Sequence, residues 1–154
     1  MVINSKIVEN GYDSYNRPSK IDGWLYDAKF TTLTIGDNIT KIGSQVFYDC
    51  DSLTSVTIPD SVTKIGYEAF YDCDSLTSVT IPDSVTSVGS SAFRGCALLT
   101  SIYCKATTPP AGGYDMFNGT AQNLKIYVPR NSVEAYKSAS NWRYYASSIE
   151  GYDF

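Results

Sequence analysis

The sequence predicts an α/β repeat solenoid in which each coil contributes one short strand, about five strands in all. The first observation is repetition: residues 48–63 and 71–86 are identical, YDCDSLTSVTIPDSVT, so the step from Tyr48 to Tyr71 is the period of the repeat. Self-similarity at such a period is typical of solenoids. The second observation is the pattern V-x-I near the start of each unit, since alternate residues of a strand point to one face.

Composition agrees with one folded domain of 154 residues, since 43% of the residues are hydrophobic and 18% are charged. The net charge is -4 with no long run of one sign, which argues against a nucleic-acid partner because such partners require a basic face. No run of 18 apolar residues predicts a membrane span. The N-terminus lacks the apolar segment of a secretion signal, so we expect either a cytoplasmic chain or a piece of a longer protein.

The sequence contains 0 histidines, which removes the commonest general base and the commonest transition-metal ligand. Serines are plentiful, but no G-x-S-x-G motif is present. We therefore expect no catalytic residues, no cofactor and no metal site. The 13 tyrosines are compatible with a contact surface, because tyrosine presents both an apolar ring and a polar hydroxyl.

Residues 1–29 do not follow the repeat and are predicted to form an N-terminal cap, which a solenoid needs to cover its open end. The pair Asn10-Gly11 lies between apolar residues and is a hairpin signal. Trp24 precedes Phe47 by one period of the repeat. We expect Trp24 to continue the aromatic column described next.

Residues 30–129 are predicted to form the repeats, with three columns of strand residues pointing inward. These columns are Phe30, Leu53, Leu76 and Leu99; Leu33, Val56, Val79 and Ile102; and Ile35, Ile58, Ile81 and Cys104. The return path adds columns of Ile39, Val62 and Val85; of Ile42, Ile65 and Val88; and of Phe47, Phe70 and Phe93. Gly43, Gly66 and Gly89 indicate either a turn with positive φ or a close approach between coils.

The spacing slips after Cys104, because the step from Ala92-Phe93 to Met116-Phe117 is longer than the period by a single position. The segment 107–113, TTPPAGG, is a loop by composition. A fifth strand is expected over residues 126–129, with Asn123 in the position where leucine is usual.

Residues 130–154 are predicted to form a C-terminal cap. Asn131 and Glu134 have the spacing of a capping box, so a short helix should run from Asn131 to about Ala139, with Val133 and Tyr136 on one face. A second apolar stripe is formed by Trp142, Tyr145, Ala146 and Ile149.

Two ladders of repeated side chains have structural and functional interpretations. Cys50, Cys73 and Cys96 share one column; side chains of one column point in parallel, which favours free buried thiols over a disulfide or a metal site. The repeated aspartates are Asp37, Asp60 and Asp83; Asp49 and Asp72; and Asp51 and Asp74. They suit turns, with calcium bound between coils as the alternative.

The repeat L-x-x-V-x-I-P-x-x-V-x-x-I-G-x-x-A-F-x-x-C, together with the ending from Ile126 to Ala146, resembles the BspA-type leucine-rich repeat of bacterial and protist surface proteins. The resemblance implies a right-handed leucine-rich repeat with a parallel sheet on its concave side. It also implies an extracellular or cell-surface location and recognition of host or matrix proteins. It implies no catalytic residues.

The strand positions expected to face outward are occupied by Ser and Thr, and other residue types replace them only toward the C-terminus. Candidate ligand-binding residues are Tyr71, Ser78, Thr80, Arg94, Ser101, Tyr103 and Tyr114. The predicted function is a non-enzymatic binding module for a protein ligand. The alternative is a structural spacer, because Ser55 and Thr57 recur unchanged as Ser78 and Thr80, whereas a ligand-specific face would usually diversify.

Overall fold

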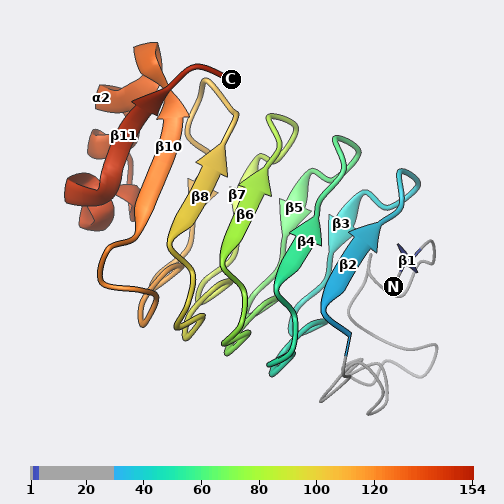
Figure 1. Cartoon of the computed structure of the whole chain (residues 1–154). Helices are drawn as coiled ribbons and strands as arrows, with labels where there is room; N and C mark the ends of the chain where they lie inside the picture. The colour runs from blue at the N-terminus through green and yellow to red at the C-terminus, as the bar shows by residue number, and fades with distance from the viewer. Residues whose placement is uncertain (1, 4–29) are drawn as a thin grey trace.

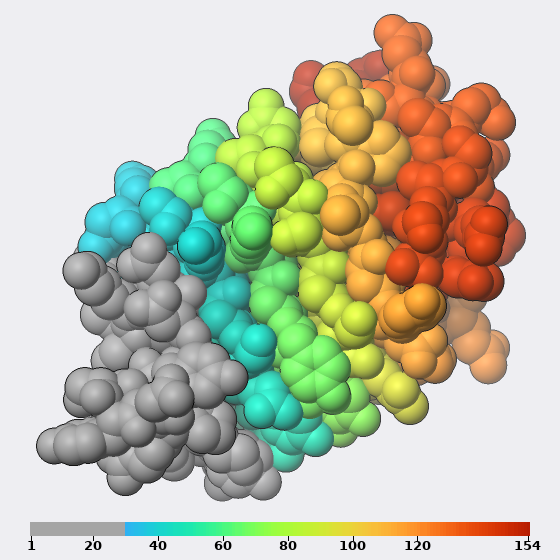
Figure 2. All heavy atoms as spheres, turned by 180° about the vertical axis from the view of Figure 1, so that it is seen from behind, coloured from blue at the N-terminus to red at the C-terminus, as the bar shows by residue number. Residues whose placement is uncertain are grey.

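A computed structural model of the chain shows a stack of coils whose strands form a large sheet and, on the return path of four of the coils, a small sheet (Figure 1). The structure describes residues 2–3 and 30–154. The expected hairpin at Asn10-Gly11 and the expected position of Trp24 lie outside the described residues. From behind, successive coils form adjoining oblique stripes of side chains (Figure 2). The predicted repeat solenoid is confirmed.

The large sheet is parallel throughout and has seven strands rather than the expected five. In spatial order they are β1 (Val2–Ile3), β2 (Thr32–Ile35), β4 (Ser55–Thr57), β6 (Ser78–Ile81), β8 (Ser101–Cys104), β10 (Lys125–Pro129) and β11 (Ile149–Tyr152). The repeats account for the middle five. The additional strands β1 and β11 come from the two segments that do not follow the repeat.

The small sheet lies on the return path and is also parallel. Its strands are β3 (Lys41–Ile42), β5 (Lys64–Ile65), β7 (Ser87–Val88) and β9 (Ala111–Gly112). The strand β9 falls inside the segment 107–113 that composition predicted to be a loop. It pairs with β7 through Ser87 opposite Ala111. The additional residue of this coil therefore lies between β8 and β9, and the register is regular again at β9.

Side chains of one column meet between coils and build the core. The rings of Phe47 and Phe70 have centroids 5.0 Å apart, and those of Phe70 and Phe93 are 5.2 Å apart with planes 3° from parallel. Phe117 continues the stack at 5.9 Å from Phe93. All four rings are buried, which confirms the predicted aromatic column.

The regular spacing of the glycines reflects a close approach of backbones and not a positive φ. A Cβ on Gly66 would lie 2.6 Å from the carbonyl carbon of Gly43, and one on Gly89 would lie 2.5 Å from that of Gly66. Real Cβ atoms do not approach backbone so closely, so any larger residue would force the coils apart.

Within the repeats, the residues whose φ is positive, in the left-handed region, lie in the turn that follows the small-sheet strand of each coil. They form two columns, Gln45, Glu68, Ser91 and Asp115, and Asp49, Asp72, Gly95 and Gly119. Asp and Gly tolerate this conformation better than most residues. The expected turn role of the aspartates is therefore observed at Asp49 and Asp72.

All four cysteines are buried and free, as the column geometry predicts. The thiols of Cys73 and Cys96 each donate to a backbone carbonyl oxygen at 3.1 Å, those of Phe47 and Phe70 respectively. Burial raises the pKa of the Cys104 thiol well above its usual range. Buried free thiols act as small apolar side chains.

The chain from Asn123 onward differs from its predicted form in three places. The expected capping box is wrong: Asn131 lies within the 3₁₀-helix η1 (Arg130–Ser132), and the helix α2 (Val133–Ser138) has no side-chain cap. Ile149 belongs to β11 instead of a helical stripe. Leu124, not Asn123, takes the buried leucine position, because the turn before it closes one residue later, with its N–H donating to the Ala121 carbonyl oxygen at 3.0 Å.

Three side chains of the C-terminal segment donate hydrogen bonds to the lengthened connection between β8 and β9. The Ser132 hydroxyl donates to the carbonyl oxygen of Thr107 at 2.8 Å, and the Tyr136 hydroxyl donates to that of Ala106 at 2.9 Å. The indole N–H of Trp142, at the start of the 3₁₀-helix η2 (Trp142–Ser148), donates to that of Pro110 at 2.7 Å. Both rings are fully buried, so their hydrogen bonds satisfy groups that water cannot reach.

Alkaline pH should lower the stability of the fold by favouring ionisation of the Tyr136 phenol in the unfolded chain. Burial raises the pKa of its phenol well above the usual value, so the folded state keeps the proton while the unfolded chain releases it near about pH 10. The contribution to stability is fully present below that pH and is lost as the pH rises above it. Urea denaturation at pH 8 and pH 11 should show a loss of stability at pH 11 that is smaller in Tyr136→Phe. An equal loss in both proteins would contradict this assignment.

Candidate functional site

Four of the seven sequence-predicted residues lie on the outer face of the large sheet. Ser78 and Thr80 belong to β6, and Ser101 and Tyr103 belong to β8. The register places Ser78 beside Ser101 and Thr80 beside Tyr103. Their side chains are exposed or half-buried, while the residues between them are buried. This alternation is that of a strand with one face on the core.

An aromatic group occupies the C-terminal end of this face. The ring centroid of Tyr103 lies 4.9 Å from that of Tyr127, and the ring of Tyr152 lies 5.4 Å from both. Phe154 packs on Tyr152 at 5.1 Å. We call these four residues the tyrosine cluster. Tyr152 and Phe154 remain 42% and 53% exposed, so much of their apolar surface faces solvent.

Sequence reasoning found only Tyr103 of this cluster. Tyr127 carried a usable signal, because it follows Tyr103 at the same lengthened step that relates Ile126 to Ile102. Tyr152 and Phe154 carried none, since they depend on β11, which has no repeat pattern. The cluster therefore combines two repeat positions with a strand from outside the repeats.

Two ion pairs flank the tyrosine cluster. The ammonium of Lys125 bonds to the Glu150 carboxylate. The guanidinium of Arg130 bonds to Asp153, with Nε and Oδ1 2.6 Å apart, and this hydrogen bond lowers the pKa of Asp153. All four side chains are well exposed, so these pairs add little stability. They place charged donors and acceptors near the aromatic rings.

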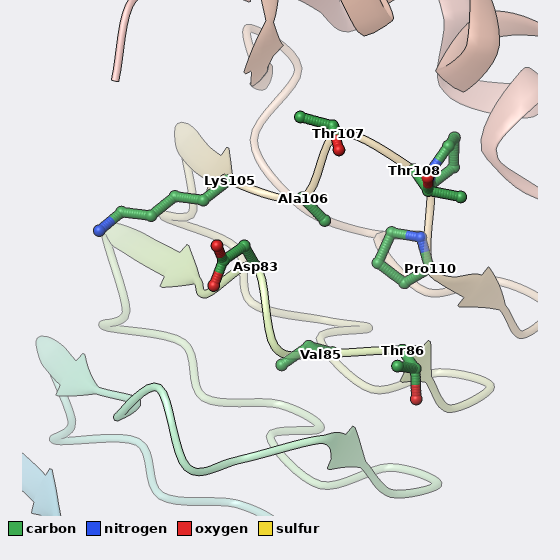
Figure 3. Close-up of a pocket in the computed structure, with 9 residues that line it drawn as sticks. Asp83, Val85, Thr86, Lys105, Ala106, Thr107, Thr108 and Pro110 are labelled. Atoms are coloured by element: carbon green, nitrogen blue, oxygen red, sulfur yellow. The ribbon is translucent and has the colours of Figure 1, made fainter.

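Two hollows open where the strands of the large sheet end. One has a volume of about 340 Å³ and lies between the turn after β6 and the segment after β8 (Figure 3). It is lined by Asp83, Val85, Thr86, Lys105, Ala106, Thr107, Thr108, Pro109 and Pro110. The other, of about 720 Å³, is lined by Lys105, Thr107, Pro129, Arg130, Asn131, Ser132, Tyr152, Asp153 and Phe154.

The remaining three predicted residues lie elsewhere, in the turns that follow the small sheet. Tyr71 stacks on Tyr48 with ring centroids 4.8 Å apart and planes 2° from parallel. Arg94 forms an ion pair with Asp115 at 3.4 Å. Tyr114 is 71% exposed. The structure thus separates the seven candidates into a sheet-face group of four and a turn group of three.

The aspartates of these turns lie close enough to influence one another. The pKa of Asp72 is raised by partial burial, with further contributions from Asp49, Asp74 and Asp51, and Arg94 opposes the shift. In the part of the chain that the structure describes, no group of three or more His, Cys, Asp or Glu side chains could hold a metal ion. Nor does any helix among residues 30–154 have the length and apolarity to cross a membrane.

Comparison with known families identifies the class of protein. Residues 22–143 match six copies of the BspA type leucine-rich repeat region. The match covers most of the chain, and the chain belongs to this family. The fold is accordingly a right-handed leucine-rich repeat solenoid. No curated protein matches the chain.

Solved structures of bacterial leucine-rich repeat proteins are similar to this chain. A leucine-rich repeat protein from Bacteroides ovatus is 30% identical, with a TM-score of 0.62 over 83% of this chain and 32% of its own. A leucine rich cell surface protein from Faecalibacterium prausnitzii is 24% identical, with a TM-score of 0.57 over 77% and 29%. The pneumococcal vaccine antigen PcpA is 19% identical, with a TM-score of 0.54 over 79% and 34%.

The chain therefore spans about a third of the length of each of these structures. The identities to the second and third are low enough that they support the fold alone. What the chain binds must be argued from its own surface.

Proposed function

We propose that this chain is a non-enzymatic binding module that contacts a protein partner through the tyrosine cluster and the adjoining face of the large sheet. The observation that carries the proposal is the change of surface along the sheet: Ser and Thr cover its N-terminal strands, and exposed aromatic rings cover its C-terminal strands. Tyrosine is enriched in the centres of protein interfaces, where its ring is buried on binding.

The partner that fits this proposal is a host or extracellular-matrix protein, with the chain forming part of a cell-surface or secreted protein. The family supports a role in protein interaction. One similar structure is described as a cell surface protein and another as a vaccine antigen, which is consistent with that location.

The test is binding of the purified chain to a panel of immobilised extracellular-matrix proteins, measured by surface plasmon resonance. Replacing Tyr103 and Tyr127 together with alanine should weaken binding at least about tenfold, since aromatic residues at an interface centre contribute more than about 1 kcal/mol each. The control is Tyr67→Ala, which removes a tyrosine that is 49% exposed in a turn after the small sheet. Unchanged affinity in the double variant would contradict the proposed surface.

A structural spacer is the second candidate, favoured by one specific observation. The exposed residues of β4 and β6 are identical, with Ser55 opposite Ser78 in the register and Thr57 matched by Thr80. Threonine hydroxyls also donate hydrogen bonds from one coil to the next, as Thr54 does to the Thr31 carbonyl oxygen at 2.9 Å. These bonds link neighbouring coils and need no ligand. Absence of binding to every matrix protein tested would favour the spacer.

A further inference from the structure

The two hollows at the strand ends adjoin, because Lys105 and Thr107 line both of them. We call the combined feature the strand-exit groove. One end reaches the tyrosine cluster through Tyr152 and Phe154. The other lies against the turn that contains Asp83 and Val85. The combined space is of the size that small-molecule and oligosaccharide ligands occupy in proteins.

The groove results from the inserted residue of the fourth coil. In the preceding coils a serine closes the space between turns, as the Ser61 hydroxyl donates to the Ile39 carbonyl at 2.7 Å and Ser84 to Val62 at 2.8 Å. Among the described residues, no side chain makes the corresponding bond to Val85. The longer segment after β8 is instead held by the C-terminal helices, through hydrogen bonds to Ala106, Thr107 and Pro110.

The groove contains a cation that has no ion-pair partner among the described residues, although Asp83 lines the same hollow. Lys125 and Arg130 are both paired with carboxylates, whereas Lys105 forms no ion pair with any residue in 2–3 or 30–154. Figure 3 shows the Lys105 side chain extended past Asp83, on the side away from Thr108 and Pro110. Lys105 lines the same hollow as Tyr152 and Phe154, so this hollow combines an exposed cation with aromatic surface and favours a ligand that carries both a negative charge and an apolar ring face.

The other lining groups favour a ligand rich in hydroxyls. The groove offers the hydroxyl of Thr107, the amide of Asn131 and the Arg130–Asp153 pair, so its lining contains both donors and acceptors. Tyr152 and Phe154 supply exposed rings on which the C–H face of a sugar can pack. Large aliphatic side chains, which would anchor the side chains of a peptide, are nearly absent from the lining.

We propose that the strand-exit groove binds an acidic saccharide, with a uronic-acid carboxylate on Lys105 and an adjacent sugar ring on Tyr152 and Phe154. The net charge of the chain is -4, which repels densely charged polyanions at long range. The expected ligand is therefore a glycan with isolated carboxylates rather than one with clustered sulfates. This site shares Tyr152 and Phe154 with the protein contact proposed above and goes beyond it through Lys105, which lies outside the tyrosine cluster.

The test is isothermal titration calorimetry of the purified chain with a hyaluronan hexasaccharide, which carries one carboxylate per disaccharide, and with neutral maltohexaose. We expect binding of the first and at least about tenfold weaker binding of the second, since a charge-assisted hydrogen bond is lost. Lys105→Ala should weaken hyaluronan binding about tenfold, and Tyr152→Ala should also weaken it. The matched controls are Lys64→Ala, an exposed lysine of β5, and Tyr67→Ala, which should both bind as the parent chain does.

Three outcomes would overturn the proposal: no binding of hyaluronan, equal binding of maltohexaose, or equal binding by Lys105→Ala. A polyglutamate peptide is the further probe. If it binds with the same dependence on Lys105 while hyaluronan does not, the ligand is an acidic peptide and the saccharide assignment is wrong. Lys105→Ala keeps the two proposals distinguishable, because it should weaken hyaluronan binding while the matrix-protein contact, which does not use Lys105, stays unchanged.

Discussion

Replacing Phe70 with alanine should lower the free energy of unfolding by about 3–5 kcal/mol, the usual effect of truncating a buried phenylalanine. Phe70 is fully buried and its ring stacks on both Phe47 and Phe93 at 5.0 and 5.2 Å. The cavity would lie in the middle coil, where stacked rings on both sides prevent neighbouring side chains from collapsing into it. Urea denaturation followed by circular dichroism measures the change.

The control for Phe70→Ala is Thr57→Ala, in which the side chain lost lies on the exposed face of β4. We expect a change within about 0.5 kcal/mol there, as is usual for surface substitutions. A loss at Phe70 as small as that at Thr57 would contradict the idea that the aromatic column holds the coils together.

Replacing Trp142 with alanine should have an effect of similar size, about 3–5 kcal/mol. The Trp142 ring is fully buried, packs at 5.7 Å from Phe117 and donates to the Pro110 carbonyl. Its removal opens a cavity at the end of the aromatic column and leaves a buried carbonyl without its partner, which adds a desolvation penalty.

The two substitutions should differ in where the structure loosens. A solenoid is stabilised largely by contacts between neighbouring coils, so Trp142→Ala should raise amide hydrogen exchange first in β9 and β10 and leave β4 protected. Tyr144→Ala is the control, because Tyr144 is 68% exposed on the same 3₁₀-helix. Uniform loss of protection along the whole stack would show instead that the fold opens as one cooperative unit.

The repeat predicts most of the fold because each of its positions has one physical role. Phe70 and Gly66 recur at the same place in each coil, and the structure shows that one fills the centre while the other allows the backbones to meet. The strands of the five repeat coils followed from the same reasoning. Where a pattern repeats, a single structural explanation accounts for every copy.

Prediction failed where the pattern stops. The strand β11 contains a single buried apolar residue, Ile149, so no alternation marks it as a strand. The capping-box spacing at Asn131 and Glu134 misled because Asn131 lies inside η1, which makes Ser132 the residue before α2. The Ser132 hydroxyl in turn bonds to Thr107 at 2.8 Å, a tertiary contact that spacing cannot reveal. Tyr152 and the strand-exit groove depend on these two features and were therefore beyond sequence reasoning.

The close approach of the glycines determines where this protein can accept foreign sequence. Gly113 lies against the Ser90 backbone much as Gly89 lies against Gly66, since a Cβ on Gly113 would be 2.2 Å from the Ser90 nitrogen. The fourth coil thus regained its register despite its additional residue, by bulging only at the strand exit. A peptide grafted at the exposed Thr108 would extend this bulge and leave the hydrogen bonds to Ala106 and Thr107 in place, so this solenoid can serve as a scaffold for displaying peptides.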